Sequence, residues 1–361
     1  MFRADGAVAL MLLLCLSCRE SRENNSLRAG PDTLQLVPVD TVGVSAGDDS
    51  QVFGEIGEAG CSPTGELVVL DRTTCRLIFF DQTNLCVRTM GGCGSGPGEF
   101  LSPTDFAFLS DGKLAVADWG ARTVWLFDDS LRFAGSMGVF YPGSPSGIEP
   151  GRDGSIIGVG IRMEASEQRV SGESFLGRWN RTGEETVSYL ATPIRVVPEN
   201  EDQIRIEYNE LLFAVGSDGD VFAAEASDSI YRITGFTEGG ESFLEISEPW
   251  ERVARTDAEL SDDSLASHGG VASPELFRQA VAGLAADENG QLWVRLGSVP
   301  HPMFIVYSRE GDTLFFAECA SLPDTMFTLG FSCSAGGLLA WDTDPLDYPK
   351  IIRLEFADQL P

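Results

Sequence analysis

A short motif recurs along this chain and restricts its fold more than any other feature of the sequence. The motif is a turn glycine, a five-residue apolar strand, an acidic residue, a short loop and a second apolar strand that ends in Asp. Glycine accepts the positive φ of a tight hairpin turn, and near-continuous apolar runs suit strands that are buried on both faces. The turn recurs at six glycines: Gly65, Gly112, Gly154, Gly219, Gly290 and Gly336.

The spacing of these repeats predicts an all-β fold, a six-bladed β-propeller of four-stranded antiparallel blades. Three of the five intervals are close to the roughly 40–50 residues of one blade, and the two longer ones indicate insertions. Because the last blade has three evident strands, we expect residues 33–44 to supply the fourth strand and close the ring. The predicted propeller spans 32–361, with blades at 49–92, 97–139, 143–191, 205–248, 275–320 and 323–358.

The second repeat carries a family resemblance. The run from Gly94 to Pro103, together with Asp111-Gly112 and the strand that ends at Asp128, closely resembles an NHL repeat. The resemblance is strong over 94–138, fair over 52–91 and degenerate elsewhere. The chain as a whole is similar to bacterial six-bladed β-propeller lipoproteins, most of which have no assigned activity. The resemblance therefore implies the fold and adds little about chemistry.

The N-terminus predicts export. Arg3 provides a basic start, and the apolar stretch that follows is too short to span a bilayer. The segment Cys15-Leu16-Ser17-Cys18 resembles a bacterial lipobox, although Cys15 stands where leucine is usual. The resemblance implies a signal peptide over 1–17, lipidation of Cys18, and a polar tether over 18–31 that holds the protein at the membrane, facing the periplasm or the cell surface. An ordinary secretory signal and an uncleaved anchor are the alternatives.

The charge balance limits the partners of the protein. The chain has 55 acidic and 25 basic residues, a net charge of −30. Such a surface repels nucleic acids and anionic lipid headgroups, so contact with the membrane is expected through the lipid anchor only. It attracts cations such as calcium and basic peptides, or it simply keeps the protein soluble. We expect a monomer.

Six cysteines remain after the signal peptide and lipobox, and export to an oxidising compartment allows them to form disulfides. They are Cys61, Cys75, Cys86, Cys93, Cys319 and Cys333. The sequence does not fix their pairing. The strand order favours a bridge between Cys75 and Cys93, because both lie near the same end of the first predicted blade.

The loop after the second strand of each blade opens on one face of a propeller, here called the loop face, where small ligands and peptides usually bind. Four blades place an acid at the start of this loop: Asp71, Asp118, Glu225 and Asp342. Carboxylates that converge around a central channel could hold calcium. The alternative is that each acid caps its own turn.

Other side chains of the same loops are candidates for ligand binding. Arg72, Arg122 and Arg295 could bind a carboxylate or phosphate, or could pair with neighbouring acids. Trp119 lies in a loop and could stack on a ligand. Residues 249–275 form the longest insertion and could act as a lid or merely connect two blades. Residues 161–176 are polar and predict an exposed hairpin extension of the third blade.

Common catalytic signatures are missing from the sequence. The chain has two histidines, and HExxH, Walker A and GxSxG motifs do not occur. One hypothesis is therefore a non-enzymatic module that binds an envelope protein, a peptide or a glycan. The other is a calcium-dependent lactonase- or lyase-like hydrolytic propeller, although no asparagine occupies these second-strand loops as the gluconolactonase type would require.

Overall fold

The computed structural model describes residues 32–166, 169–198, 204–207, 209–257, 260, 276–297, 302–322, 330–334, 337–342 and 348–357. The predicted signal peptide, Cys18 and the tether lie outside these residues. So do residues 258–259 and 261–275, which make up most of the insertion, and the turn glycine Gly336. Within the described part of the chain, no helix is long and apolar enough to cross a membrane.

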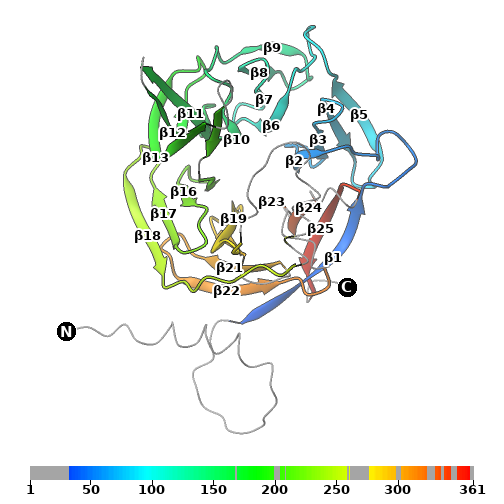
Figure 1. Ribbon diagram of the computed structural model, residues 1–361. Coiled ribbons are helices and arrows are strands. Elements are labelled where there is room, and N and C mark those ends of the chain that lie inside the picture. Colours follow the sequence, from blue (N-terminus) through cyan, green and yellow to red (C-terminus); the bar gives the residue numbers. More distant parts are fainter. Residues whose placement is uncertain are drawn as a thin grey trace, which may run out of the picture.

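The protein is an all-β propeller whose blades are four-stranded and antiparallel, arranged in a ring (Figure 1). The first sheet contains β2 (Ile56–Cys61), β3 (Leu67–Asp71), β4 (Arg76–Phe80) and β5 (Cys86–Gly91). The second contains β6 (Pro103–Phe108), β7 (Leu114–Asp118), β8 (Thr123–Phe127) and β9 (Phe133–Ser136). Another four-stranded sheet contains β15 (Leu211–Val215), β16 (Val221–Glu225), β17 (Tyr231–Phe236) and β18 (Ser242–Glu248).

Two larger sheets complete the ring. A five-stranded sheet holds β10 (Ser146–Pro150), β11 (Ile156–Ser166), β12 (Arg169–Trp179), β13 (Glu185–Pro198) and β14 (Ile204–Glu207). An eight-stranded sheet holds, in spatial order, β19 (Val281–Ala286), β20 (Leu292–Leu296), β21 (Met303–Tyr307), β22 (Thr313–Glu318), β1 (Thr33–Val42), β25 (Lys350–Phe356), β24 (Gly337–Asp342) and β23 (Gly330–Ser334). The described strands thus form five sheets rather than six separate ones, and the predicted count of six blades is not confirmed.

The N-terminal strand β1 joins the two ends of the chain. Leu36 pairs with Phe356 and Val42 with Ile351, so β1 runs antiparallel to β25 over most of its length. Its first residues pair in parallel with β22, beginning with Thr33 opposite Phe316. The prediction that residues 33–44 add a strand to the end of the propeller is therefore confirmed by the pairing of β1.

The repeated motif forms the two middle strands of the four-stranded sheets, β3 and β4 in the first and β7 and β8 in the second. The turn glycines Gly65 and Gly112 have φ values of 83° and 82°, in the left-handed region that favours glycine. All five residues of β3 are buried, and so are all five of β7, because each strand packs between two neighbouring sheets. Val68 of β3 and Val116 of β7 belong to one such apolar layer. We call the face with these glycine turns the hairpin face, which lies opposite the loop face.

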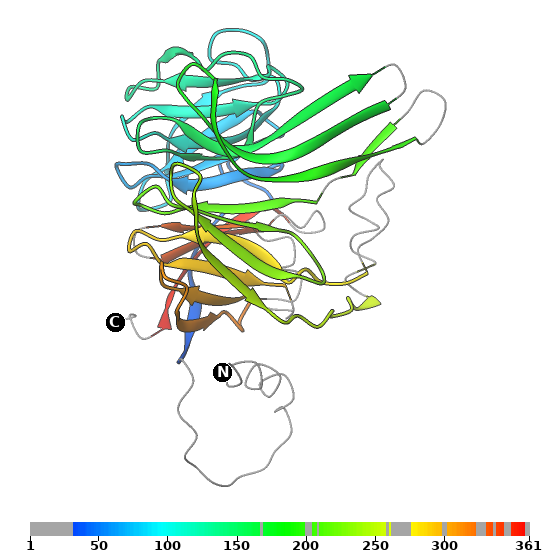
Figure 2. The same cartoon turned by 90° about the vertical axis from the view of Figure 1, so that its left-hand side faces the viewer.

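One hairpin extends far beyond the ring. Strands β11 and β12 have eleven residues each, whereas the corresponding β3 and β4 have five. Figure 2 shows these green strands and β13 projecting past the other sheets on one side of the ring. The extension predicted at residues 161–176 is therefore present as the β11–β12 hairpin, on the loop face.

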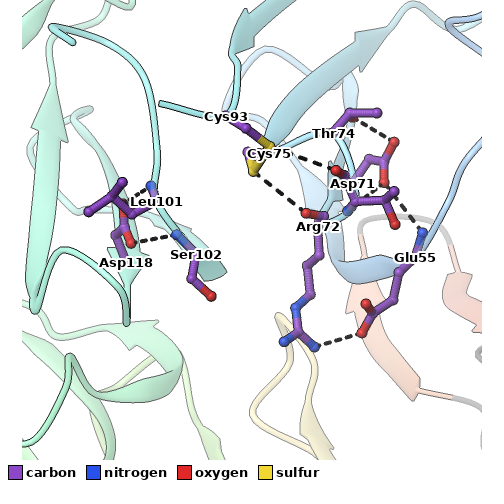
Figure 3. The surroundings of a disulfide bond; sticks show 10 residues. Glu55, Asp71, Arg72, Thr74, Cys75, Cys93, Leu101, Ser102 and Asp118 are labelled. Carbon is purple, nitrogen blue, oxygen red and sulfur yellow. Dashed lines mark hydrogen bonds and ion pairs between the residues drawn. A yellow bond between two sulfur atoms is a disulfide. The ribbon is translucent and has the colours of Figure 1, made fainter. Parts of the chain in front are cut away.

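A disulfide fastens the loop face of the first sheet (Figure 3). It joins Cys75, at the start of the third strand, to Cys93, which follows the fourth strand, with Cα atoms 5.0 Å apart. Cys75 is buried and adopts a left-handed φ of 51°. The bridge is the one that the strand order favours.

We expect the double substitution Cys75→Ser, Cys93→Ser to lower the free energy of unfolding by about 3 kcal/mol. The bridge joins residues 18 positions apart and so restricts the unfolded chain. Its loss gives conformational entropy back to the unfolded chain, which favours unfolding. Urea unfolding under oxidising conditions measures the change. Cys86→Ser is the matched control, because Cys86 is a half-buried thiol outside the bridge. Equal stabilities of the double variant and the wild type would contradict a stabilising role for the bridge.

Candidate functional site

The carboxylate of Asp118 is occupied by its own blade. Asp118 is the last residue of β7 and is fully buried. It accepts hydrogen bonds from the amides of Leu101 and Ser102, both at 2.9 Å, and from the amide of Ala121 at 3.0 Å. The indole Nε1 of Trp125 donates to the same carboxylate at 3.2 Å. Asp118 therefore fastens the inter-blade connection to the turn between β7 and β8.

Asp71 has the same role in the first sheet, where it ends β3 (Figure 3). Its carboxylate accepts from the amides of Glu55 and Thr73 and from the hydroxyl of Thr74, the last at 2.7 Å. Asp71 is also fully buried. At both positions the structure favours the turn-capping interpretation, because local donors already surround the carboxylates.

The predicted ring of calcium ligands is not assembled by the described residues. Asp71 and Asp118 are directed into separate turns, and Glu225 accepts a hydrogen bond from Nδ2 of Asn209. The side chain of Asp342 lies outside the described part of the molecule. Across the residues that are described, no group of three or more His, Cys, Asp or Glu side chains is placed to hold a metal ion.

The predicted binding residues Arg72, Arg122 and Trp119 lie on the loop face, Arg72 in the first sheet and the other two in the β7–β8 turn of the second. Arg72 pairs with Glu55 through Nη1 and Oε1, 2.8 Å apart. Arg122 closes the β7–β8 turn with a left-handed φ of 55°. Trp119 is 37 % exposed, and its ring lies over Gly143, where an added Cβ would come within 2.3 Å of it.

Arg295 corrects one prediction. It was expected to present its guanidinium on a loop, but it lies within β20 and is only 5 % exposed. Burial lowers the pKa of Arg295 to about 10, because the apolar surroundings disfavour the charged form. Arg295 is buried because the apolar strand β20 continues past this position to Leu296.

The described flanks of the insertion and one loop of the loop face together form a pocket. It has a volume of about 480 Å³ and lies between the β16–β17 loop and the described flanks of the insertion. We call it the loop-face pocket. Its lining residues are Asn209, Ala226, Ser227, Asp228, Ser229, Arg252, Leu276, Phe277 and Gln279.

Backbone contacts hold the insertion against the β16–β17 loop. The amide of Ala280 donates to the carbonyl of Ser227 at 2.7 Å, and a β-bridge joins Ala254 to Phe277. Trp250 stacks on Tyr231 at the start of β17, with ring centroids 5.9 Å apart. The described flanks of the insertion are therefore a packed wall, in which Phe277 lies in a β-bridge.

An ion pair marks the wall of the loop-face pocket. Arg252 pairs with Asp228 of the β16–β17 loop, and both side chains keep partial solvent exposure, 50 % and 32 %. The guanidinium of Arg252 also lies over the ring of Phe277, 3.8 Å from its centroid. The stacking positions the guanidinium, so the pocket offers fixed donors on Arg252 and fixed acceptors on Asp228 side by side.

Three acids on inner strands were missed by the sequence reasoning. Glu58 of β2, Asp105 of β6 and Glu149 of β10 lie on the first strands of three successive sheets. Asp105 is buried and accepts a hydrogen bond from the amide of Phe106 at 2.6 Å. Glu149 accepts from the amide of Val215 on the neighbouring sheet. A signal existed, because Glu58 and Asp105 both stand seven residues before their turn glycines, Gly65 and Gly112.

The inner-strand acids favour their neutral forms. Burial, with a contribution from the charge of Glu149, raises the pKa of Asp105 to about 8. Burial raises the pKa of Glu149 to about 7. The pKa of Glu58 is raised well above its ordinary value by burial and by the charge of Asp105. The three carboxyls thus form an electrostatically linked set across neighbouring sheets.

Several solved structures are similar to this chain over most of its length. A protein from Bacteroides fragilis that is described as exported matches with a TM-score of 0.51 and 14 % identity, covering 88 % of this chain and 94 % of that one. Virginiamycin B lyase from Staphylococcus aureus matches with a TM-score of 0.47 and 11 % identity, covering 89 % and 99 %. A gluconolactonase from Xanthomonas campestris matches with a TM-score of 0.47 and 12 % identity, covering 84 % and 87 %.

These similarities concern the fold alone, because the identities are low. No protein-family model matches the chain, and no curated protein matches it either. The class of protein defined by the fold is therefore a β-propeller, whose structural neighbours include an exported protein as well as lyase and lactonase enzymes. The NHL resemblance stays a prediction, and neither a binding role nor an enzymatic one is decided by the neighbours.

We expect Asp118→Ala to lower the free energy of unfolding by roughly 3 kcal/mol, since it leaves several buried donors without an acceptor. Urea unfolding with and without a chelator measures this loss and separates it from a metal effect. Asp128→Ala, in an exposed turn on the hairpin face, is the comparison variant. A chelator that lowers wild-type stability as much as the substitution does would show that Asp118 acts through a metal.

We expect the thermal midpoint of unfolding to fall as the pH rises from 5 to 8. Asp105 and Glu149 have pKa values near 4 in the unfolded chain, and about 8 and about 7 in the fold. Their stabilising contribution is therefore complete below pH 4 and is lost progressively as the pH rises from about 4 to about 8. Asp105→Asn should flatten this decline, and Asp128→Asn should not. Identical pH profiles for wild type and Asp105→Asn would contradict the assignment.

Proposed function

We propose that this protein is a non-enzymatic binding module of the cell envelope, and that its ligand is a glycan held in the loop-face pocket. The observation that carries the proposal is the pocket itself, formed by the β16–β17 loop and the packed flanks of the insertion. It lies on the face where propellers usually present their ligand-binding loops. A rigid ring that holds such loops in place is suited to recognition, although fold alone does not fix function.

The chemistry of the lining supports a polyhydroxylated ligand. A sugar hydroxyl both donates and accepts hydrogen bonds. Asp228 provides acceptors, Arg252 provides donors, and the amides of Asn209 and Gln279 are groups of both kinds. Because Arg252 and Asp228 neutralise each other, the pocket suits a neutral ligand better than a strongly charged one. Leu276 and Phe277 add apolar surface for the carbon face of a sugar ring.

The path of β1 supports the expected attachment to the membrane. Leu36 pairs with Phe356, at the end of β25 on the hairpin face, and β1 then runs toward the loop face. The preceding segment thus enters the ring on the hairpin side. With Cys18 lipidated as the lipobox resemblance implies, the hairpin face is directed to the membrane and the loop-face pocket away from it. The similarity to an exported protein is in keeping with this placement.

The proposal includes a ring of six NHL-like blades. The eight-stranded sheet is interpreted as two blades, β19–β22 and β23–β25 with β1, which are joined because β1 pairs with both. β14 is interpreted as an addition to the third blade, where it extends β13.

We expect the wild-type protein to bind at least one soluble oligosaccharide on a glycan array, and Asp228→Ala to weaken that binding about tenfold, since charge-assisted hydrogen bonds contribute roughly 1.5–3 kcal/mol. Isothermal titration calorimetry measures the dissociation constant. Arg72→Ala is the matched control, because it also breaks a loop-face ion pair, on a different blade. Failure of every glycan to bind, or equal binding by Asp228→Ala, would contradict the proposal.

A further inference from the structure

Strand β11 is longer than the strand that should cover its inner edge. In β10–β11 the pairing begins with Ser146 opposite Val159 and ends with Pro150 opposite Ile156. The next seven residues of β11, 160–166, pair with β12 on their other side. No described strand pairs with their inner edge. The second strands of the four-stranded sheets differ in this respect, since β3, β7 and β16 are paired with their inner neighbours along their whole length.

The direction of the backbone groups follows from the β10–β11 turn. The carbonyl of Ser155 accepts a hydrogen bond from the amide of Gly151, so the backbone groups of Ser155 are directed to the β10 side. Every second residue of a strand directs its amide and carbonyl to the same side, and β11 has no bulge of its own beyond this point. Ile161, Met163 and Ala165 therefore direct their backbone amides and carbonyls to the uncovered edge. The backbone groups of Arg162 face β12 instead. In agreement with this, a Cβ atom added to Gly172 of β12 would lie 2.4 Å from the carbonyl oxygen of Arg162.

The usual protection of an exposed edge is missing from this segment. In natural proteins, proline, lysine, β-bulges or a short length keep an edge strand from pairing with another chain. Residues 160–166 contain neither proline nor lysine. The charge of Arg162 is engaged by Glu173 and Glu185, and its guanidinium lies 3.6 Å from the ring centroid of Phe175. This arginine therefore covers the face of the sheet rather than its edge.

Two exposed aromatic side chains lie close to the start of the edge. Gly143, which Trp119 covers, stands three residues before Ser146, the residue at which the pairing with β11 begins. Tyr141 stands two residues further back and is 73 % exposed. Ser144, between them and β10, has a buried hydroxyl without a hydrogen-bond partner. Apolar surface and backbone donors and acceptors thus lie together on the loop face.

We infer that the inner edge of β11 at residues 160–166 binds an extended peptide segment of a partner protein, which adds a strand to the sheet in line with β10. Main-chain hydrogen bonds to Ile161, Met163 and Ala165 would hold the peptide, and Trp119 and Tyr141 would contact its side chains. The uncovered segment is about 23 Å long, enough for a peptide of about seven residues.

Charge selects this occupant. A net charge of −30 on the chain favours a basic peptide, and it opposes pairing of two copies of this chain through the same edge. Glu164, which is exposed, adds negative charge within the segment. The N-terminal tether is a poor occupant, because β1 enters the ring from the hairpin face and β11 extends from the loop face.

The experiment uses a phage-displayed library of random twelve-residue peptides selected on the wild-type protein, followed by calorimetry with the selected synthetic peptides. We expect selected sequences rich in Lys and Arg. Met163→Pro removes an amide from the uncovered edge while keeping the β11–β12 ladder, and it should weaken binding at least about tenfold. Met163→Thr, which keeps the amide, should bind within about threefold of the wild type. Trp119→Ala should also weaken binding.

A second measurement keeps the inference testable if Met163→Pro does not fold. Peptides that are N-methylated at one residue at a time are titrated against the wild-type protein, and a bound strand loses affinity at every second methylated position. Equal binding by all methylated peptides, or selection of acidic peptides, would overturn the inference. So would a wild-type dimer in sedimentation that Met163→Pro abolishes, because the edge would then bind a second copy. Loss of the glycan response in Asp228→Ala leaves this edge unaffected and tests the loop-face pocket separately.

Discussion

The pairing of β1 with β25 and β22 is the contact on which the arrangement of the other sheets depends. It joins residues 33–42 to strands more than 270 residues later in the chain. On one side β1 pairs with the edge of β25, and on the other its first residues pair with the edge of β22. Without it, β22 and β25 would each present an unpaired outer edge. The pairing also places the start of β1 on the hairpin face of the ring.

Within that ring, the loop face is stabilised mainly by local interactions. Asp71 and Asp118 end the second strands of their sheets and hold the following turns and the incoming connections with buried hydrogen bonds. The Cys75–Cys93 bridge adds a covalent link in the first sheet. These two acids therefore stabilise the turns of their own blades. The loop-face pocket lies elsewhere, beside the described flanks of the insertion.

The candidate sites were only partly visible in the sequence, for identifiable reasons. The repeat predicts the β16–β17 loop, but Arg252 comes from the insertion and Phe277 follows it, and the packing of these residues against that loop has no counterpart in the repeat. The apolar run before Arg295 predicts a loop at this position, whereas the strand includes Arg295 and continues for one more residue. Glu58 and Asp105 were overlooked because single acids in apolar strands look unremarkable until neighbouring sheets bring them together.

The amino-acid sequence alone indicates the all-β class, the hairpin turns at the repeated glycines and the added N-terminal strand, and it favours the Cys75–Cys93 bridge without fixing it. These features follow from local backbone chemistry and from repetition, which a single sequence displays directly. Only the packing of the sheets decides which acids are enclosed, where the described flanks of the insertion lie and which strand edge has no partner among the described strands. Those properties depend on how neighbouring sheets are placed relative to one another, and residues far apart in the chain determine that placement.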